Sequence, residues 1–174
     1  ATDVYNTAVG HGAGYLITTG QYNTLIGGLA GDAITSGSQN TAVGYQSLSA
    51  GVASYYNTAL GYQALLADTT GRESVAVGRN ALRTQNDTTS SSMYNTAVGA
   101  NAGYAVTTAT RDTLVGGLAG DALTTGSFNV AVGYTSLGAT TTGASNVALG
   151  DAALSSNTTG STNTAVGQAA LSSN

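Results

Sequence analysis

The sequence contains no cysteine and no lysine, and its positive charge comes from four arginines. Without cysteine the chain can form neither a disulfide framework nor a thiolate metal site. Charged residues make up 7% of the sequence, against about 25% in typical soluble domains. Because neutralising a phosphate backbone takes clustered lysine and arginine, nucleic-acid binding is disfavoured. The formal net charge of −4 is spread over too few groups to steer a charged partner.

Long hydrophobic segments are absent as well. No apolar run approaches the roughly 18–20 residues of a membrane-spanning helix, so we expect no membrane insertion by this segment. No charged stretch followed by an apolar one opens the chain, as it would in a signal peptide. The lack of cysteine is compatible with an extracellular protein whose stability does not come from disulfides, and we expect that location.

A five-residue phrase recurs ten times, first as Asn-Thr-Ala-Val-Gly at residues 6–10. Every step between copies is 17 residues except one of 21. A fixed period of this kind predicts units that stack on their neighbours. The chain begins and ends inside the repeat, so we expect it to be an excised segment of a longer protein. The copies begin at Asn6, Asn23, Asn40, Asn57, Ser74, Asn95, Asp112, Asn129, Asn146 and Asn163.

Each repeat, numbered from its first residue, has a constant pattern. Position 5 is always glycine, which predicts a turn with positive φ or a close neighbour. Positions 2 (Thr or Val) and 4 (Val, Ile or Leu) alternate with positions 1 and 3, so the two pairs lie on opposite faces of a short strand. A second glycine-centred corner predicts a second strand in each coil. We interpret position 2, where Val75, Val130 and Val147 replace threonine, as a buried β-branched position.

Stacking places like residues over like. Eight coils begin with asparagine, which predicts a ladder of amide hydrogen bonds along the array. Tyr5–Leu82 aligns without a gap on Tyr94–Leu171, so five coils are duplicated as a block, and the four extra residues at the join predict a protruding loop or a kink. We expect a single array over 1–174, with coils 1–5 at about 6–83, an inserted loop at 84–93 and coils 6–10 at about 95–174.

The segments Asn40–Leu48 (Asn-Thr-Ala-Val-Gly-Tyr-Gln-Ser-Leu) and Asn57–Leu65 (Asn-Thr-Ala-Leu-Gly-Tyr-Gln-Ala-Leu) resemble the head repeats of trimeric autotransporter adhesins. They look even more like the repeats of phage and bacterial tail-fibre proteins. The resemblance implies an all-β fold, a left-handed parallel β-roll or β-solenoid, with three identical chains around one axis. It also implies a surface fibre, a phage tail fibre or a bacterial adhesin, that attaches to a host. Adhesin heads usually have shorter periods, so the extra residues here should enlarge an outer loop.

The residues themselves also favour a homotrimer. Both faces of the predicted strand carry small or branched apolar side chains, whereas a solvated face would carry charged or long polar ones. The second apolar face therefore needs a partner, which we expect to be two identical chains. Ten coils at roughly 4.8 Å per rung give an array about 48 Å long.

Catalytic arrangements are missing from the sequence. His11 is the single histidine and occupies a variable position. The repeated Asp32 and Asp121 lie five coils apart, about 24 Å at roughly 4.8 Å per rung, whereas glycosidase carboxylates lie about 5–9.5 Å apart. We expect no enzymatic activity, no cofactor and no metal site.

Binding is expected at the inserted loop and at tyrosines that follow the glycine corner, because exposed aromatic rings stack on sugars and anchor interfaces. The partner would be a host glycan or surface protein. The alternative is that these tyrosines cover the corners or pack between subunits. Arg72, Arg79 and Arg83 fall within one coil, where an anion site is the alternative to paired or solvated arginines. The candidate receptor-binding residues are Gln85, Asn86, Asp87, Met93, Tyr45, Tyr62 and Tyr134.

Ice binding is the alternative function, since flat β-solenoids with regular threonine rows can order water. Position 2 carries seven threonines, but we interpret that position as buried. Threonine also recurs at positions 13 and 14, where Val52 and Ala53 interrupt the rows. The insertion after Leu82 is expected to break the even spacing that an ice-binding face needs, so the fibre is favoured.

Overall fold

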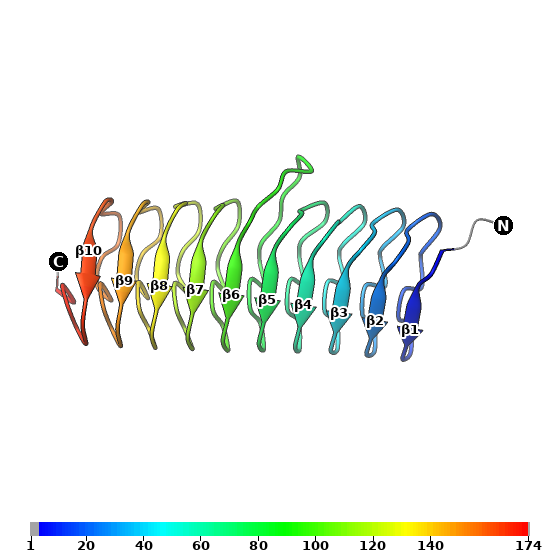
Figure 1. Cartoon of the computed structure of the whole chain (residues 1–174), viewed down its shortest axis with the longest axis horizontal. Helices are drawn as coiled ribbons and strands as arrows, with labels where there is room; N and C mark the ends of the chain where they lie inside the picture. Colours follow the sequence, from blue (N-terminus) through cyan, green and yellow to red (C-terminus); the bar gives the residue numbers. More distant parts are fainter. Residues whose placement is uncertain (1–3, 174) are drawn as a thin grey trace.

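Ten three-residue strands lie side by side in chain order in one parallel sheet. The computed structural model describes residues 4–173. Each strand coincides with positions 2–4 of one repeat, so the prediction of an all-β, parallel β-solenoid is confirmed (Figure 1). The strands are β1 (Thr7–Val9), β2 (Thr24–Ile26), β3 (Thr41–Val43), β4 (Thr58–Leu60), β5 (Val75–Val77), β6 (Thr96–Val98), β7 (Thr113–Val115), β8 (Val130–Val132), β9 (Val147–Leu149) and β10 (Thr164–Val166).

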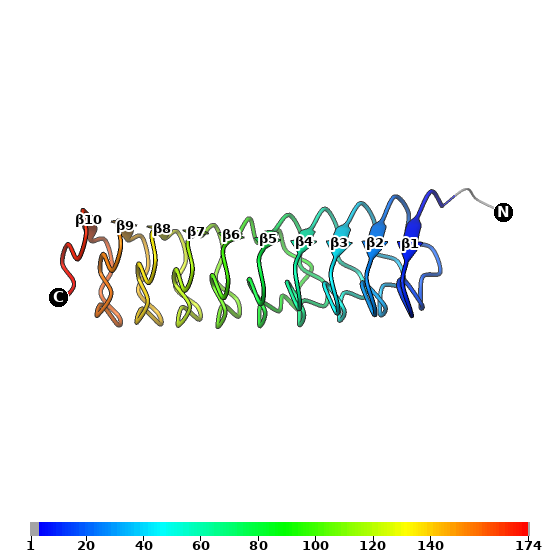
Figure 2. The ribbon, with the colours of Figure 1, turned by 90° about the horizontal axis from the view of Figure 1, so that it is seen from below.

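The solenoid is left-handed, as the resemblance implied. In Figure 1 every strand runs downward on the near side while the coils advance from right to left. Figure 2 places all ten strands on one side of the molecule, with the rest of each coil behind them. A chain that descends in front, returns behind and moves leftward turns in the left-handed sense.

The strands pair in register through the whole array. Thr58 pairs with Val75, one period along, and Val75 pairs with Thr96 across the longer step. The four extra residues therefore leave the sheet undisturbed, and they emerge as a protruding loop between β5 and β6 (Figure 1). The expectation that the insertion would break the even spacing of the rows is wrong for this sheet.

The predicted second strand is not formed. Among residues 4–173, pairing outside β1–β10 is limited to isolated bridges that join Ser38, Tyr55, Arg72 and Ser92 in turn. The remainder of each coil turns through residues with positive φ at positions 7, 9 and 17, most of which are not glycine. Their backbone groups still bond to the next coil, as Leu48 N–H does to the Ala64 carbonyl at 2.9 Å. Stacking therefore provides hydrogen-bond partners for backbone groups of the turns as it does for those of the strands.

The glycine at position 5 is required twice over. Gly44 has a φ of +131°, which side-chain-bearing residues rarely adopt. A Cβ on Gly44 would also lie 2.6 Å from the carbonyl oxygen of Gly61 in the next coil. The tight corner and the stacking distance both depend on the missing side chain.

The thin core is filled in two alternative ways. In coils such as the third, a buried leucine at position 9 (Leu48) faces an alanine at position 3 (Ala42). In the second coil Leu25 fills position 3 and Gly31 occupies position 9, where an added Cβ would lie 2.8 Å from a methyl carbon of Leu25. A coil with glycine at position 9 also places a branched residue at position 12 in the core, as Ile34 does here, so the interior stays filled.

Positions 1 and 3 point into the coil, and positions 2 and 4 point out of it. In β3, Asn40 and Ala42 are buried while Thr41 and Val43 are only half-buried. The interpretation of position 2 as a buried position is therefore wrong. Threonine and valine are interchangeable there because both suit an outward strand position.

The predicted asparagine ladder is confirmed. The backbone N–H and the Nδ2 of Asn40 both donate to Oδ1 of Asn23, each at 3.0 Å. Nδ2 of Asn40 also donates to the Ser54 carbonyl at 2.8 Å. Each buried amide thus links two coils and closes its own coil, which offsets the cost of removing it from water.

Candidate functional site

The inserted loop has a buried base and an exposed tip. Gln85 and Met93 are 0% and 2% exposed, Asp87 is also buried and Asn86 is half-buried. The exposed residues are 88–91, two threonines followed by two serines. The side chains of Gln85 and Met93 therefore lie inside the coil, and the surface that the loop offers consists of hydroxyl groups.

Gln85 repairs the asparagine ladder where Ser74 interrupts it. Its Nε2 donates to Oδ2 of Asp68 at 2.7 Å and to Oγ of Ser74 at 3.1 Å. Its Oε1 accepts from Nδ2 of Asn95 at 2.9 Å. Gln85 is thus a structural bridge between two halves of the array. Burial raises the pKa of Asp68, although hydrogen bonds from Gln85 and from backbone N–H groups lower it in part.

Asp87 stiffens the protruding loop from within. Its Oδ1 accepts from the backbone N–H of Thr89 at 2.8 Å and from the Thr89 hydroxyl at 2.6 Å, and its Oδ2 accepts from the Ser91 N–H. Burial alone would raise the pKa of Asp87, but these hydrogen bonds and the charge of Arg72 outweigh it, and the pKa is lowered. The loop therefore holds one shape around an ionised carboxylate.

Tyr45, Tyr62 and Tyr134 lie at a different corner from the inserted loop. They occupy position 6, just after the strands, whereas the loop enters just before β6. All three are exposed, and the rings of Tyr45 and Tyr62 stack with centroids 5.8 Å apart. The structure does not bring these tyrosines together with the loop residues.

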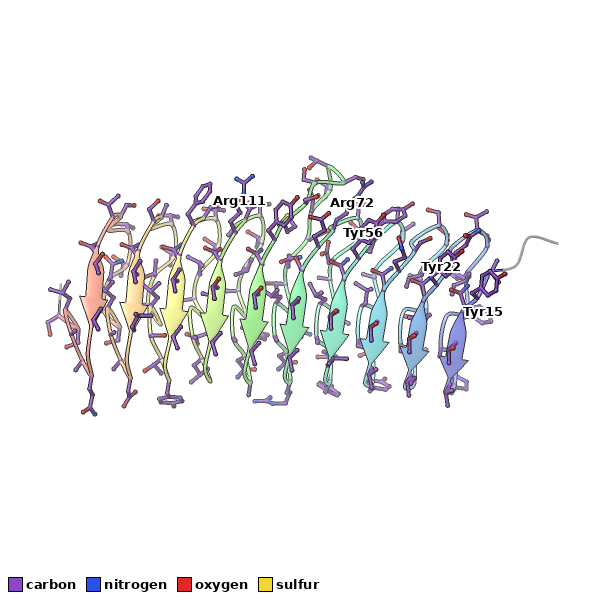
Figure 3. The ribbon with its side chains drawn as sticks, viewed as in Figure 1. Tyr15, Tyr22, Tyr56, Arg72 and Arg111 are labelled. Atoms are coloured by element: carbon purple, nitrogen blue, oxygen red, sulfur yellow. The ribbon has the colours of Figure 1, made fainter. Side chains whose placement is uncertain are left out.

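A second aromatic row shares the edge of the molecule from which the loop protrudes. Figure 3 shows Tyr22, Tyr56, Arg72 and Arg111 along this edge. We call residues at position 17 and their neighbours at position 16 the aromatic corner. A long or aromatic side chain immediately precedes each of the first eight repeats. This residue is position 17 of a 17-residue coil and position 21 of the longer fifth coil, and the eight residues are Tyr5, Tyr22, Gln39, Tyr56, Glu73, Tyr94, Arg111 and Phe128.

Ring and guanidinium contacts organise the aromatic corner. The rings of Tyr5 and Tyr22 stack at 5.5 Å and 8°. The Arg111 guanidinium lies between two rings, 5.9 Å from the Tyr94 centroid and 5.3 Å from that of Phe128. Cation–π contacts of this kind hold an arginine in place without a carboxylate.

Arg72 is the polar centre of the aromatic corner. Its guanidinium lies 4.8 Å from the Tyr55 centroid, and the Tyr55 and Tyr56 rings lie 6.4 Å apart. Its Nε is buried without a hydrogen-bond partner in the structure. The Nε of Arg83, by contrast, has a hydrogen-bond partner, because it donates to Oε1 of Gln63 at 3.0 Å. The sequence singled out Arg72 only with Arg79 and Arg83, as an alternative anion site. It did not select Tyr56 or Arg111 as candidate binding residues, although the recurrence of large side chains at positions 16 and 17 was a usable signal.

A small cavity lies beside the first two coils. Its volume is about 380 Å³, and His11, Gly12, Tyr15, Leu29 and Asp32 line it. Oδ1 of Asp32 accepts from the Ser49 hydroxyl at 2.6 Å. Among residues 4–173, no group of three or more His, Asp or Glu side chains is placed to hold a metal ion.

Asp112 is a buried acid within the asparagine ladder. Its Oδ1 accepts from the backbone N–H of Asn129 at 2.7 Å and from Nδ2 at 3.3 Å, but its Oδ2 is buried without a partner. Burial raises the pKa of Asp112 to about 7, and the hydrogen bonds from Asn129 lower it only in part. This rung of the ladder is therefore sensitive to pH near neutrality.

The outward side of the sheet is uncharged, with a row of aliphatic side chains at position 4 and a row of mostly threonines at position 2. Positions 2 and 4 of β1–β10 are Thr, Val, Ile or Leu without exception. Val98 is 36% exposed in the middle of the array, and Val166 is 68% exposed in β10. We call this surface the outer sheet face.

These features define a parallel β-solenoid repeat protein with one uncharged face and one aromatic corner. No family model, curated protein or solved structure matches the chain. The described part of the chain, residues 4–173, contains no helix suited to crossing a membrane.

Proposed function

We propose that the chain is a structural and receptor-binding segment of a trimeric surface fibre, a phage tail fibre or a bacterial adhesin that mediates attachment to a host surface. The segment acts outside the cell, where it spaces and presents a binding surface. The proposal assigns it no catalysis, cofactor or metal. The observation that carries it is the outer sheet face, together with the resemblance of the repeats to fibre proteins.

The occupants of the outer sheet face are two further copies of the chain. Ten strands about 4.8 Å apart, each with a five-residue edge of roughly 16 Å, present on the order of 700 Å² before the corners are counted. A stable interface buries about 800 Å² per partner. Because two copies share this face, the strands supply about 350 Å² to each contact, and the adjoining corners supply the rest. Because positions 2 and 4 carry no charge in any strand, identical copies can approach without repulsion or a buried unpaired ion.

The array also has the mechanical properties of a spacer. Each coil bonds to the next through the strands, the turns and the asparagine ladder. Bending the array would break several of these hydrogen bonds together, so it behaves as a rod.

Light scattering on the purified chain tests the assembly. A trimer of 17.0 kDa chains has a mass of 51 kDa. Val98→Glu places a charge on the outer sheet face and should lower the mass to that of one chain, because a buried unpaired carboxylate is costly. Thr108→Glu, at an exposed position 14 behind the sheet, is the matched control. A wild-type mass near 17.0 kDa at micromolar concentration would contradict the proposal.

Ice binding is the second candidate, and the outer sheet face is the observation in its favour. Threonines at position 2 point outward in seven strands, and the insertion leaves the rows evenly spaced. The threonines at position 13 are less suitable, because hydroxyls such as that of Thr124 donate to the next coil. A face buried between copies cannot contact ice, so ice shaping and thermal hysteresis by a protein of single-chain mass would favour this candidate over the fibre.

A further inference from the structure

The aromatic corner beside the inserted loop contains two parallel rows of chemically varied side chains. The isolated bridges place Ser38, Tyr55 and Arg72, at position 16, side by side with Ser92, which is position 19 of the longer fifth coil. The adjacent row consists of the residues that immediately precede the next repeat. We call these residues the corner platform, which consists of Ser38, Tyr55, Arg72 and Ser92 in one row and Gln39, Tyr56, Glu73 and Tyr94 in the other.

The fold does not require the large side chains of the corner platform. In the duplicated block, Ser145 and Thr162 stand where the first block has Tyr56 and Glu73. The backbone is the same, with φ of 60° at Tyr56 and 58° at Ser145. Small and large side chains thus occupy the same left-handed turn, so the turn itself does not require a ring at Tyr56.

The platform has little net charge and no exposed aliphatic side chain. Arg72 and Glu73 are adjacent and opposite in charge, and the Asp87 carboxylate is engaged by the loop itself. An anionic polymer would need clustered positive charge. Tyrosine and arginine also anchor protein interfaces, so a protein partner is the alternative occupant, and absence of polysaccharide binding would favour it.

A sugar ring can use both the aromatic and the polar side chains of the platform. A pyranose has a C–H face that stacks on an aromatic ring and hydroxyls that bond to forked or acidic side chains. Tyr56 is 53% exposed, and the half-buried Arg72 holds its guanidinium over the neighbouring Tyr55 ring, 4.8 Å from the ring centroid. The stiff hydroxyl-bearing tip at residues 88–91 protrudes from the same edge (Figures 1 and 3).

We propose that the corner platform binds a neutral carbohydrate chain, with a sugar ring stacked on Tyr56 and its hydroxyls bonded by Arg72, Glu73 and the loop tip. The carbohydrate chain lies along the solenoid axis, because the platform spans four coils, about 14 Å in that direction. The inference rests on the proposed attachment function and names the chemical class of receptor that this segment takes.

Affinity electrophoresis of the full chain tests the proposal, with neutral polysaccharides (dextran, glucomannan, galactan and β-1,3-glucan) and the acidic polymer alginate in the gel. At least one neutral polymer should retard the protein. Tyr56→Ala should weaken that retardation about tenfold, whereas Tyr56→Phe, which keeps the ring, should stay within about twofold of wild type. Tyr15→Ala, which removes an exposed ring in the first coil outside the corner platform, is the matched control and should bind as wild type does.

Three results would overturn the proposal. The first is no retardation by any neutral polymer. The second is retardation that Tyr56→Ala and Tyr15→Ala reduce equally. The third is a change in molecular mass with Tyr56→Ala, which would make the platform a contact between copies. Light scattering on the same samples keeps the two proposals separate: a trimer that binds no polysaccharide refutes only the carbohydrate site, and a single chain that binds refutes only the trimer.

Discussion

Replacing Asp112 with asparagine should stabilise the solenoid, and the gain should grow with pH. Eight other coils have asparagine at this position. In seven of those coils Nδ2 donates a hydrogen bond to a carbonyl of its own coil, as in Asn95 to Ala109 at 2.7 Å. Asp112 has an oxygen in place of that nitrogen, and its Oδ2 is buried without a partner. The substitution restores the missing donor in an unchanged volume.

The size and sign of the effect follow from the pKa. Burial raises the pKa of Asp112 to about 7 from 3.8, so between these values the folded chain keeps a proton that the unfolded chain has lost. Stability therefore falls as pH rises through this window, and the loss is complete above about pH 7. At about 1.4 kcal/mol per pKa unit, the destabilisation is on the order of 4 kcal/mol.

Urea denaturation followed by circular dichroism, for wild type and Asp112→Asn, measures this difference. Near pH 4 the two proteins should agree within about 1 kcal/mol, because the protonated acid can donate. Near pH 8 the variant should be more stable by up to about 4 kcal/mol. Asp151→Asn, at an exposed position, is the control and should change little at either pH.

Other buried acids, such as Asp68, are present in both proteins and cancel in the comparison. A stability difference that stays constant between pH 4 and pH 8, or a variant less stable than wild type near pH 8, would refute the reasoning. Either result would mean that the Asp112 carboxylate is solvated or paired when ionised.

Two further predictions concern the stacking of the coils. Gly44→Ala should lower the free energy of unfolding by about 3 kcal/mol or more, because the new Cβ would lie 2.6 Å from the Gly61 carbonyl oxygen in a conformation with φ of +131°. Gly167→Ala is the control: its φ is +124° but no atom lies within 4 Å of the new Cβ, so it should lower the free energy of unfolding by less in the same urea denaturation. Gln85→Ala should cost about 2–3 kcal/mol, because it leaves its buried partners unsatisfied, whereas Thr88→Ala on the exposed loop tip should be nearly neutral; equal melting temperatures for these two variants would contradict the bridging function of Gln85.

The repeat made the strands, the glycine corners and the asparagine ladder predictable. When residues 17 apart stack directly, each constant position becomes a column, and the chemistry of a column can be read from one coil. A glycine column such as Gly44 and Gly61 indicates a tight corner, and an asparagine column such as Asn23 and Asn40 indicates inter-coil amide bonds. Both interactions join neighbours that the period alone identifies.

The wrong predictions share one cause, which is that they depend on how the coil closes. Thr41 and Ala42 are both compatible with either side of a strand, and only the path of the whole coil decides that Ala42 points inward. The prediction of a second strand was wrong because residues such as Leu48 adopt positive φ, and the type of side chain gives no indication of that conformation.

For the candidate site, too, the sequence determined some features and only the tertiary structure decided others. The sequence by itself determined that an insertion follows the fifth coil and that tyrosines and arginines recur near the corners. Only the tertiary structure decided that Gln85 and Met93 are buried while Tyr56 and Arg72 lie exposed or half-buried beside the loop. The period of 17 specifies which residues stack, because stacking is a contact between equivalent positions. It does not specify which residues of different columns meet around the coil, since that follows from the closure of the chain in three dimensions.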